Sequence, residues 1–449
     1  MSLSRRRFMQ LGLSSLAYFS TAATTPNWIV RTAHAMQADC FSSDKILVIL
    51  QQSGGNDGLN TVIPRSDAIY YDAATRPTIR VPQGSEIALD GLNGLHPRLA
   101  NLANWYQQGR LAVVHNVGYL NPNFSHFVAT DYYEYGYTPD LVKPTSGWMA
   151  RFYDNHCQGA PDPDALLMCG CGISNVPDSM NGSTRYTPPA VRSASSYSFA
   201  TASDRDLRLA AINALNAPGT VDPNLEFIQR SVNVAEASTA DIANAASLPA
   251  LVPDGSYPAG SLGDGLKLVS QIIRGGFGTR VFYVSQGGYD THANQIQTGD
   301  PLVFGDHPEL LRDLDAGLHA FLTEMELSGN LDRVVVMTFS EFGRRVKENG
   351  SRGTDHGAAN CMFVLGGGVQ GGVYGGQPNL DPSSLVNGSL AHAIDFRSVY
   401  AKFMQDWFNG DPVGAFGQQV YDSVIAGELP QLGFLRSTAA GARSWQSYQ

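Results

Sequence analysis

The chain lacks the features that mark membrane proteins and nucleic-acid-binding proteins. After the first 35 residues, no segment is long and apolar enough for a membrane helix, so we expect no stable membrane anchor. Lysine and arginine number 30 against 40 aspartates and glutamates, which gives a formal net charge of −10. An acidic protein repels phosphate backbones, so we expect no nucleic acid among its partners. Small anionic substrates would also be repelled, unless bound metal ions reverse the field locally.

Cysteine is also scarce. The chain has five, namely Cys40, Cys157, Cys169, Cys171 and Cys361. Cys169 and Cys171 are too close in sequence for a comfortable mutual bridge, but either could pair with Cys157 in an oxidising compartment. The same Cys-x-Cys pair could instead bind a soft metal, although no second pair at metal-finger spacing accompanies it. The pairing of these cysteines stays open.

The first 35 residues have the parts of an export signal in the right order. The motif SRRRFMQ at 4–10 is typical of twin-arginine signals, because consecutive arginines precede a bulky apolar residue. The modestly apolar stretch at 11–23 is too short to span a bilayer. Small residues at 33 and 35 predict cleavage after Ala35, which takes the formal charge from −10 to −14. We therefore expect the twin-arginine translocase as a partner during export, and a periplasmic or extracellular product.

The rest of the chain has the pattern of an α/β protein. Continuous apolar runs are typical of parallel strands covered on both faces. They lie at 45–50, 111–114, 280–284, 333–337 and 362–365. Apolar residues at helical spacing lie between these runs, at 95–108, 125–135 and 307–328. This alternation predicts a doubly wound, mainly parallel sheet with helices on both faces.

One stretch departs from this pattern. Residues 177–258 are rich in Ala, Ser, Asn and Pro and contain few apolar runs. Within them, 203–216 and 222–246 have the signals of helices. We interpret the stretch as a helical insertion over the sheet, so that 36–449 forms a single domain.

Acids, imidazoles, a hydroxyl and a guanidinium follow four of the predicted strands, most of them beside glycines. These residues are Asp57, Ser125, His126, Asp290, His292, Glu341, Arg344, Asp355 and His356. In open α/β sheets, ligands bind beyond the carboxyl ends of the strands. Carboxylate with imidazole is the ligand mix for Zn²⁺ or Mn²⁺. Each residue also has a structural alternative, such as a helix cap for Ser125 or an ion pair for Glu341, but their convergence on one edge favours a site.

Five sequence blocks together resemble the signature blocks of a bacterial family, domain of unknown function 1501. The blocks are GGNDGLN at 54–60, SHF at 125–127, YDTHA at 289–293, SEFGR at 340–344 and GTDHG at 353–357. The resemblance extends from about residue 45 to about 407 and keeps the order of the family's blocks. It implies the alkaline-phosphatase-like fold, which sulfatases share. Active members of that superfamily hydrolyse or transfer phosphate or sulfate esters, using divalent metals and a nucleophile at a helix N-terminus.

The resemblance also implies roles for single residues. Asp290 matches the aspartate that opens the third metal motif, and His356 matches the late metal histidine. The superfamily's first-strand aspartate falls nearest Ser53, so Asp57 would have to reach in from further along. The usual Asp-His pair after the fourth strand reads Glu341-Phe342 here. In place of the superfamily's nucleophile stands Pro122, so Ser125 is the nearby hydroxyl.

We therefore hypothesise a metal-dependent hydrolase acting on phosphate or sulfate esters of small molecules or polymers. Asp290, His292 and His356 would hold a divalent metal, with Asp57, Glu341 or Asp355 completing or supporting the shell. Zinc or manganese fits this ligand set before calcium or magnesium. Ser125 would attack, next to His126, and Arg344 or Arg345 would clamp the ester group.

Two other functions compete with this hypothesis. The first is a non-catalytic exported binding or assembly protein on a degenerate scaffold, with 177–258 as its binding surface. The second is a dinucleotide-dependent dehydrogenase. The loop after the first strand lacks the Gly-x-Gly-x-x-Gly spacing, which counts against that class.

The export signal makes a direct prediction. Replacing Arg5 and Arg6 with lysine keeps the charge but removes the paired guanidinium groups, so the full chain should stay in the cytoplasm as the uncleaved precursor. Cell fractionation and the mass of the N-terminal peptide measure this. Cleavage after residue 35 in the doubly substituted chain would contradict the signal.

Overall fold

The computed structural model describes residues 44–156, 170–183, 188, 190–191, 242–297 and 304–436. The predicted signal peptide and the predicted helix at 203–216 lie outside these ranges, as do Cys40, Cys157 and Cys169. Most of the predicted helix at 222–246 also lies outside them, although 242–246 are helical.

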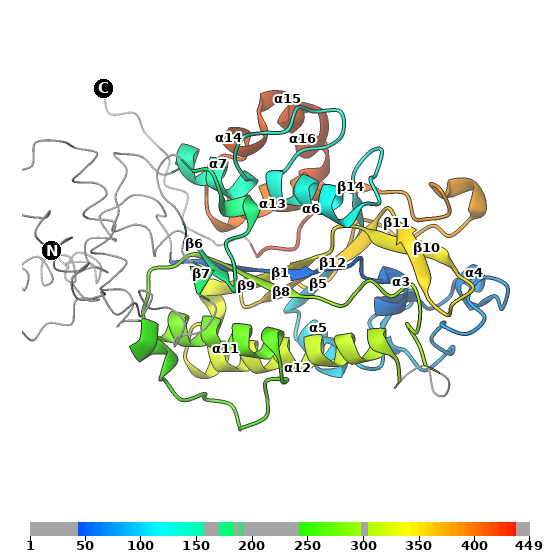
Figure 1. Ribbon diagram of the computed structural model, residues 1–449, viewed down its shortest axis with the longest axis horizontal. Coiled ribbons are helices and arrows are strands. Elements are labelled where there is room, and N and C mark those ends of the chain that lie inside the picture. Colours follow the sequence, from blue (N-terminus) through cyan, green and yellow to red (C-terminus); the bar gives the residue numbers. More distant parts are fainter. Residues whose placement is uncertain are drawn as a thin grey trace, which may run out of the picture.

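A nine-stranded sheet forms the centre of the molecule (Figure 1). Its order is β13 (Gly372–Tyr374), β5 (Leu111–Gly118), β12 (Asn360–Gly366), β9 (Val334–Phe339), β1 (Ile46–Gln52), β8 (Val281–Gln286), β6 (Gly170–Ile173) and β7 (Ala190–Val191), with β14 (Ile394–Asp395) beside β5. All five predicted apolar runs are strands of this sheet. The pairs β9–β1, β1–β8 and β8–β6 are parallel, and only β12 runs against its neighbours. The predicted α/β class with a mainly parallel sheet is confirmed.

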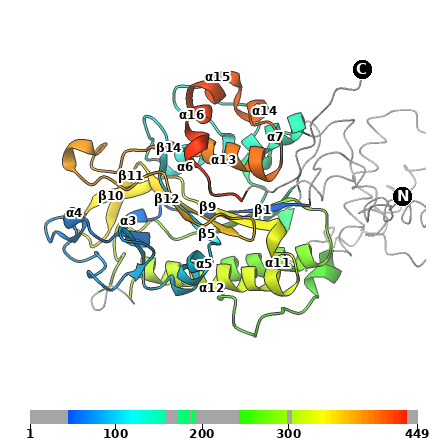
Figure 2. The ribbon, with the colours of Figure 1, turned by 180° about the vertical axis from the view of Figure 1, so that it is seen from behind.

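Helices cover both faces of the sheet (Figures 1 and 2). One layer contains α5 (Ala100–Gln107), α11 (Ser261–Arg274) and α12 (Asp306–Leu327). The other contains α6 (His126–Tyr135), α7 (Trp148–His156), α13 (Phe396–Lys402), α14 (Val413–Phe416), α15 (Gln418–Val420) and α16 (Ala426–Glu428). Among the described residues, none of the helices combines the length and apolarity that crossing a bilayer requires.

Several shorter elements accompany the nine-stranded sheet. They are α3 (Gly58–Thr61), α4 (Ala68–Tyr71), the small sheet of β2 (Val62–Pro64), β4 (Asn93–Leu95) and β3 (Ile87–Ala88), and the hairpin of β10 (Gly343–Glu348) and β11 (Thr354–Gly357). The remaining described elements are short helical turns, namely η2 (Asp178–Met180), η3 (Leu331–Arg333), η4 (Pro382–Ser384), η5 (Phe403–Trp407), η6 (Tyr421–Ile425) and η7 (Leu429–Gln431).

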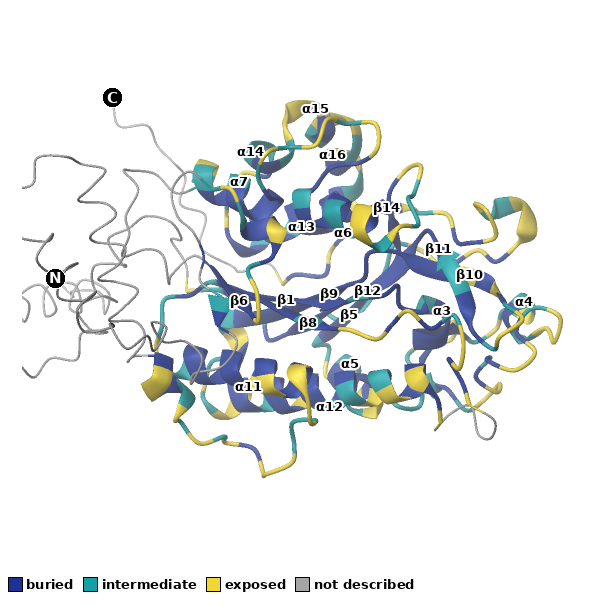
Figure 3. Ribbon diagram, in the orientation of Figure 1, coloured by how far each residue is buried: buried dark blue, intermediate teal, exposed yellow. Residues whose placement is uncertain are grey.

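The core lies on both faces of the sheet because strand side chains alternate between them. In β1, Leu47 and Ile49 join the cluster under α6, α7 and α13. Ile46, Val48 and Leu50 join the cluster under α5, α11 and α12. Every residue of β1, β9 and β12 is buried, and these strands are dark blue in Figure 3. This double burial explains why the strands have continuous apolar runs rather than alternating ones.

The sequence did not predict α11 or the strands β6 and β7. Helix α11 contains Gly263 and Gly265, which weaken a helical signal. A Cβ on Gly263 would lie 1.9 Å from the carbonyl oxygen of Pro258, and one on Gly265 would lie 3.2 Å from Ile173. The glycines thus allow the helix to pack closely. β7 falls inside the predicted insertion, so that segment also contributes a strand to the sheet.

A buried ion pair holds the loop that follows β1. Asp57 is 1% exposed, and its carboxylate accepts two hydrogen bonds from the guanidinium of Arg76, at 2.7 and 3.1 Å. It also accepts one from Gln295 at 2.6 Å. Burial opposes ionisation, but the charge and hydrogen bonds of Arg76 outweigh it and lower the pKa of Asp57. Asp57 is therefore committed to Arg76 and not to the predicted metal shell.

Asp57→Asn should destabilise the protein by about 3–5 kcal/mol, because it leaves the buried guanidinium of Arg76 without its counter-charge. The pKa of Asp57 is lower in the folded chain than in the unfolded chain. Its contribution is therefore complete above about pH 4 and is lost as pH falls through the folded value. Urea denaturation from pH 7 to pH 3 measures this. Glu309→Gln, at an exposed position of α12, should cost less than about 1 kcal/mol; equal costs for the two would contradict the assignment.

Candidate metal centre

Loops at the carboxyl ends of four strands form the site. The order β9-β1-β8 places three parallel strands side by side, and β5 points the same way because β12 is antiparallel to both β5 and β9. His126 begins α6 after β5, and Asp290 and His292 follow β8. Glu341 follows β9, and His356 lies on β11. The parallel topology therefore brings distant segments to one edge, as ligand sites in open α/β sheets require.

Asp290 is the centre of the cluster. Its Oδ1 lies 3.1 Å from Nε2 of His356 and 3.2 Å from Nε2 of His292. The two Nε2 atoms are 2.9 Å apart, so the three atoms form a nearly equilateral triangle. The other carboxylate oxygen, Oδ2, lies 3.4 Å from Nε2 of His126. Ligand atoms of His126, Asp290 and His356 all lie within 4.8 Å of one another, a spacing that a single metal ion can bridge.

The second nitrogen of each histidine faces a group that can only accept a hydrogen bond. Nδ1 of His126 is 2.9 Å from Oε1 of Glu341. Nδ1 of His356 is 2.7 Å from the carbonyl oxygen of Phe124, and Nδ1 of His292 is 3.4 Å from Oδ1 of Asp355. In the tautomer with its proton on Nδ1, each ring donates to this partner and offers the Nε2 lone pair toward Asp290. Metal-binding histidines are held in this way by their outer partners.

The ionised carboxylate of Asp290 favours a cation in the cluster. Burial opposes ionisation of Asp290, but hydrogen bonds from Arg344 and His356 and the charge of Arg344 lower its pKa to about 2. Burial lowers the pKa of His356, although its contacts with Asp290 and Phe124 partly oppose this. The lowered pKa of His356 favours its neutral imidazole next to the ionised carboxylate of Asp290. A divalent cation can bind both groups.

Glu341 and Gly54 bring the β1 and β9 loops against the cluster. Glu341 is 1% exposed, and its Oε1 accepts a hydrogen bond from the amide of Gly54 at 2.8 Å in addition to that from His126. Gly54 has φ +123°, and a Cβ there would lie 2.4 Å from the amide nitrogen of Asp290. Only glycine allows this approach. The glycines flanking the acids are thus explained by close packing of loops.

Arg344 cannot serve as the predicted substrate clamp, because the protein itself uses its guanidinium. The side chain is fully buried and donates to Oδ1 of Asp290 at 2.7 Å. It also donates to four backbone carbonyls, those of Gly54, Gly55, Tyr289 and Thr354. Arg344 therefore positions Asp290. Its neighbour Arg345 is exposed.

Ser125 is the N-cap of α6 and is exposed. N-cap serines usually accept a hydrogen bond from the first turn, but the hydroxyl of Ser125 makes no such bond. Its amide donates to Oδ1 of Asn123 at 2.8 Å. The hydroxyl is therefore available at the positive end of a helix, next to His126.

A cleft of about 600 Å³ opens beside the cluster. His126, Asp290 and Glu341 line it, together with residues of α6, of the loop after β6, and of β1 and its loop. His292, His356 and Ser125 are not among its lining residues. The sequence contained no signal for this cleft, because part of its lining comes from 175–178, at the start of the predicted insertion.

The described cysteines take no part in the site. Cys171 and Cys361 are buried and free. Burial raises the pKa of each thiol to about 12, so neither forms a thiolate at neutral pH.

Comparison with known proteins finds a family of unknown function. The model of the family described as "Protein of unknown function (DUF1501)" matches residues 274–409. This segment contains three of the five sequence blocks, those at 289–293, 340–344 and 353–357. The match supports the resemblance over less than a third of the chain. No protein with a curated function matches the sequence.

Several solved structures are similar at low scores. A protein in the alkaline phosphatase superfamily from Vibrio parahaemolyticus is 13% identical, with TM-score 0.33 over 82% of this chain and 70% of that chain. Phosphonate monoester hydrolase SpPMH from Silicibacter pomeroyi is 8% identical, with TM-score 0.35 over 86% and 77%. Lipoteichoic acid synthase LtaP from Listeria monocytogenes is 10% identical, with TM-score 0.30 over 73% and 67%.

The cluster predicts metal binding that depends on named side chains. The protein should bind about one equivalent of Zn²⁺ or Mn²⁺. His356→Gln removes a ligand and should abolish this, whereas Glu341→Gln removes an outer partner and should weaken it about 10- to 100-fold. Mass spectrometry of metal content after dialysis measures both. His319→Gln, at an exposed histidine of α12, is the control; unchanged metal content in the His356 variant would refute the site.

Proposed function

We propose that the chain is a metal-dependent hydrolase of phosphate or sulfate esters. One observation carries the proposal: the Nε2 atoms of three histidines lie within 3.4 Å of the carboxylate of Asp290, and two of these four side chains line a cleft. A structural ion pair needs no such convergence and no cleft. The agreement of the five sequence blocks with this geometry adds support.

The donor atoms fit a small transition metal. Zinc bonds of about 2.1 Å in tetrahedral geometry separate ligand atoms by about 3.4 Å. The edges of the triangle at Asp290, His292 and His356 are 2.9, 3.1 and 3.2 Å. A ligand set rich in imidazole favours Zn²⁺ or Mn²⁺ over Ca²⁺ or Mg²⁺, which prefer oxygen.

When bound, the metal would neutralise the ester oxygens and lower the pKa of an attacking hydroxyl or water. The chain's own residues prepare this step. Glu341 and the carbonyl of Phe124 hold the ring orientations of His126 and His356. Arg344 holds Asp290 from the buried side, so the open side stays free for substrate.

Ser125 is the proposed nucleophile. Its free hydroxyl lies at the start of α6, where the helix end favours developing negative charge. Hydrolysis would then take two displacements. The Ser125 oxygen forms a bond to phosphorus or sulfur as the bond to the alcohol oxygen breaks, and the serine proton ends on the departing alcohol. Water then displaces the group as phosphate or sulfate and restores the serine.

Ser125→Ala should reduce kcat for chromogenic phosphate or sulfate esters by more than about 100-fold, with metal content unchanged. Asp290→Asn should remove both activity and metal. Turnover and metal analysis of the same samples separate these effects. Bound metal without turnover of phosphate, phosphodiester or sulfate esters would favour the non-catalytic binding protein, and neither metal nor turnover would reject the proposal.

A further inference from the structure

The cleft beside the cluster has a volume of about 600 Å³ and can hold the rest of a substrate. Asp290 and His126 line it together with residues of α6 and of the loop after β6. The alcohol part of an ester bound at the cluster would therefore contact α6 and that loop. This inference rests on the proposed function, because it assigns the substrate class of the same site.

The lining of this cleft is acidic. It contains Asp131, Glu134 and Asp178 besides Asp290 and Glu341, and no lysine or arginine. Asp131 is paired with Lys143, which lies outside the lining. Glu134 is buried and accepts hydrogen bonds from the hydroxyl of Tyr283 and the amide of Ser179. Asp178 is exposed, and its Oδ1 accepts a hydrogen bond from the side-chain amide of Asn181 at 3.1 Å. Its charge also helps to raise the pKa of Lys143, although Lys143 pairs directly with Asp131.

An aromatic ring completes the lining. Phe127 belongs to the first turn of α6, lines the cleft, and is 90% exposed. A ring this exposed gains nothing from the core, but its face can bind a cation or an apolar group. Carboxylates with an aromatic face are the combination that recognises ammonium groups.

We propose that this cleft selects esters whose alcohol part carries an amino or quaternary ammonium group. Phe127 would contact the ammonium substituents, and Asp178 would supply the counter-charge. The same acids would exclude alcohols that carry a second anionic group. Phe127 and Asp178 are thus specificity-determining residues and not catalytic ones.

Binding to the metal-free protein tests the inference without turnover. Choline and its neutral isostere 3,3-dimethylbutan-1-ol have the same shape and differ in charge. Titration calorimetry should show choline binding more tightly by at least about fivefold. Phe127→Ala should weaken choline binding about three- to tenfold, and Asp178→Asn about fivefold.

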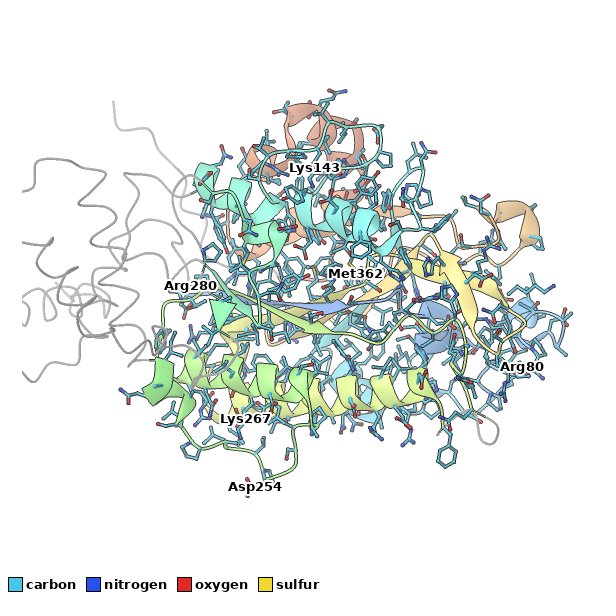
Figure 4. The ribbon with its side chains drawn as sticks, in the orientation of Figure 1. Arg80, Lys143, Asp254, Lys267, Arg280 and Met362 are labelled. Atoms are coloured by element: carbon cyan, nitrogen blue, oxygen red, sulfur yellow. The ribbon has the colours of Figure 1, made fainter. Side chains whose placement is uncertain are left out.

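Asp254→Asn is the matched control and should change nothing. Asp254 is exposed and lies across the sheet from Lys143 (Figure 4). Equal affinity for choline and the isostere, or choline affinity unaffected by both cleft variants, would overturn the inference.

Turnover separates this inference from the proposed function. The metal-loaded chain should have a higher kcat/KM for phosphocholine or choline sulfate than for 3-phosphoglycerate, and Asp178→Asn should reduce the ratio. Hydrolysis with the opposite preference would overturn the ammonium pocket alone. Selective choline binding without hydrolysis of any ester would overturn the hydrolase proposal and leave the pocket standing.

Discussion

The buried guanidinium of Arg344 is the constraint on which the site depends. A charge without solvent must be satisfied by its neighbours, and Arg344 achieves this through four carbonyls and one carboxylate. Those acceptors come from the β1 loop, the β8 loop and β11. The same side chain therefore joins three segments and holds Asp290 in its ionised form. The positions of the three histidines around Asp290 follow from that arrangement together with their own Nδ1 partners.

Much of the fold could be predicted because buried strands have a simple signature. Strands buried on both faces have continuous apolar runs, and parallel strands bring their carboxyl ends to one edge of the sheet. The meeting of Asp290, His292 and His356 follows from those two facts and the position of each residue after its strand. The structure places them within 3.2 Å of one another.

Other features depended on partners that no local pattern reveals. Asp57 looks like a ligand in its glycine-rich block, but Arg76 neutralises it inside the protein. Arg344 looks like a clamp, but its donors face backbone carbonyls. His126 was expected beside the nucleophile, and its Nε2 also lies 3.4 Å from Oδ2 of Asp290. The wall of the cleft at Asp178 comes from a segment without periodicity. Such assignments need the three-dimensional contacts, because burial and partner choice decide whether a charged side chain is structural or functional.

The central claim is that a metal ion lies where Asp290 Oδ1 and the Nε2 atoms of His292 and His356 converge. Anomalous X-ray diffraction from crystals grown with zinc or manganese, recorded on both sides of the metal's absorption edge, tests it most directly. The account predicts one dominant anomalous peak about 2.1 Å from these atoms. A loaded crystal with no peak there, or with its main peak at another side-chain cluster, would contradict it.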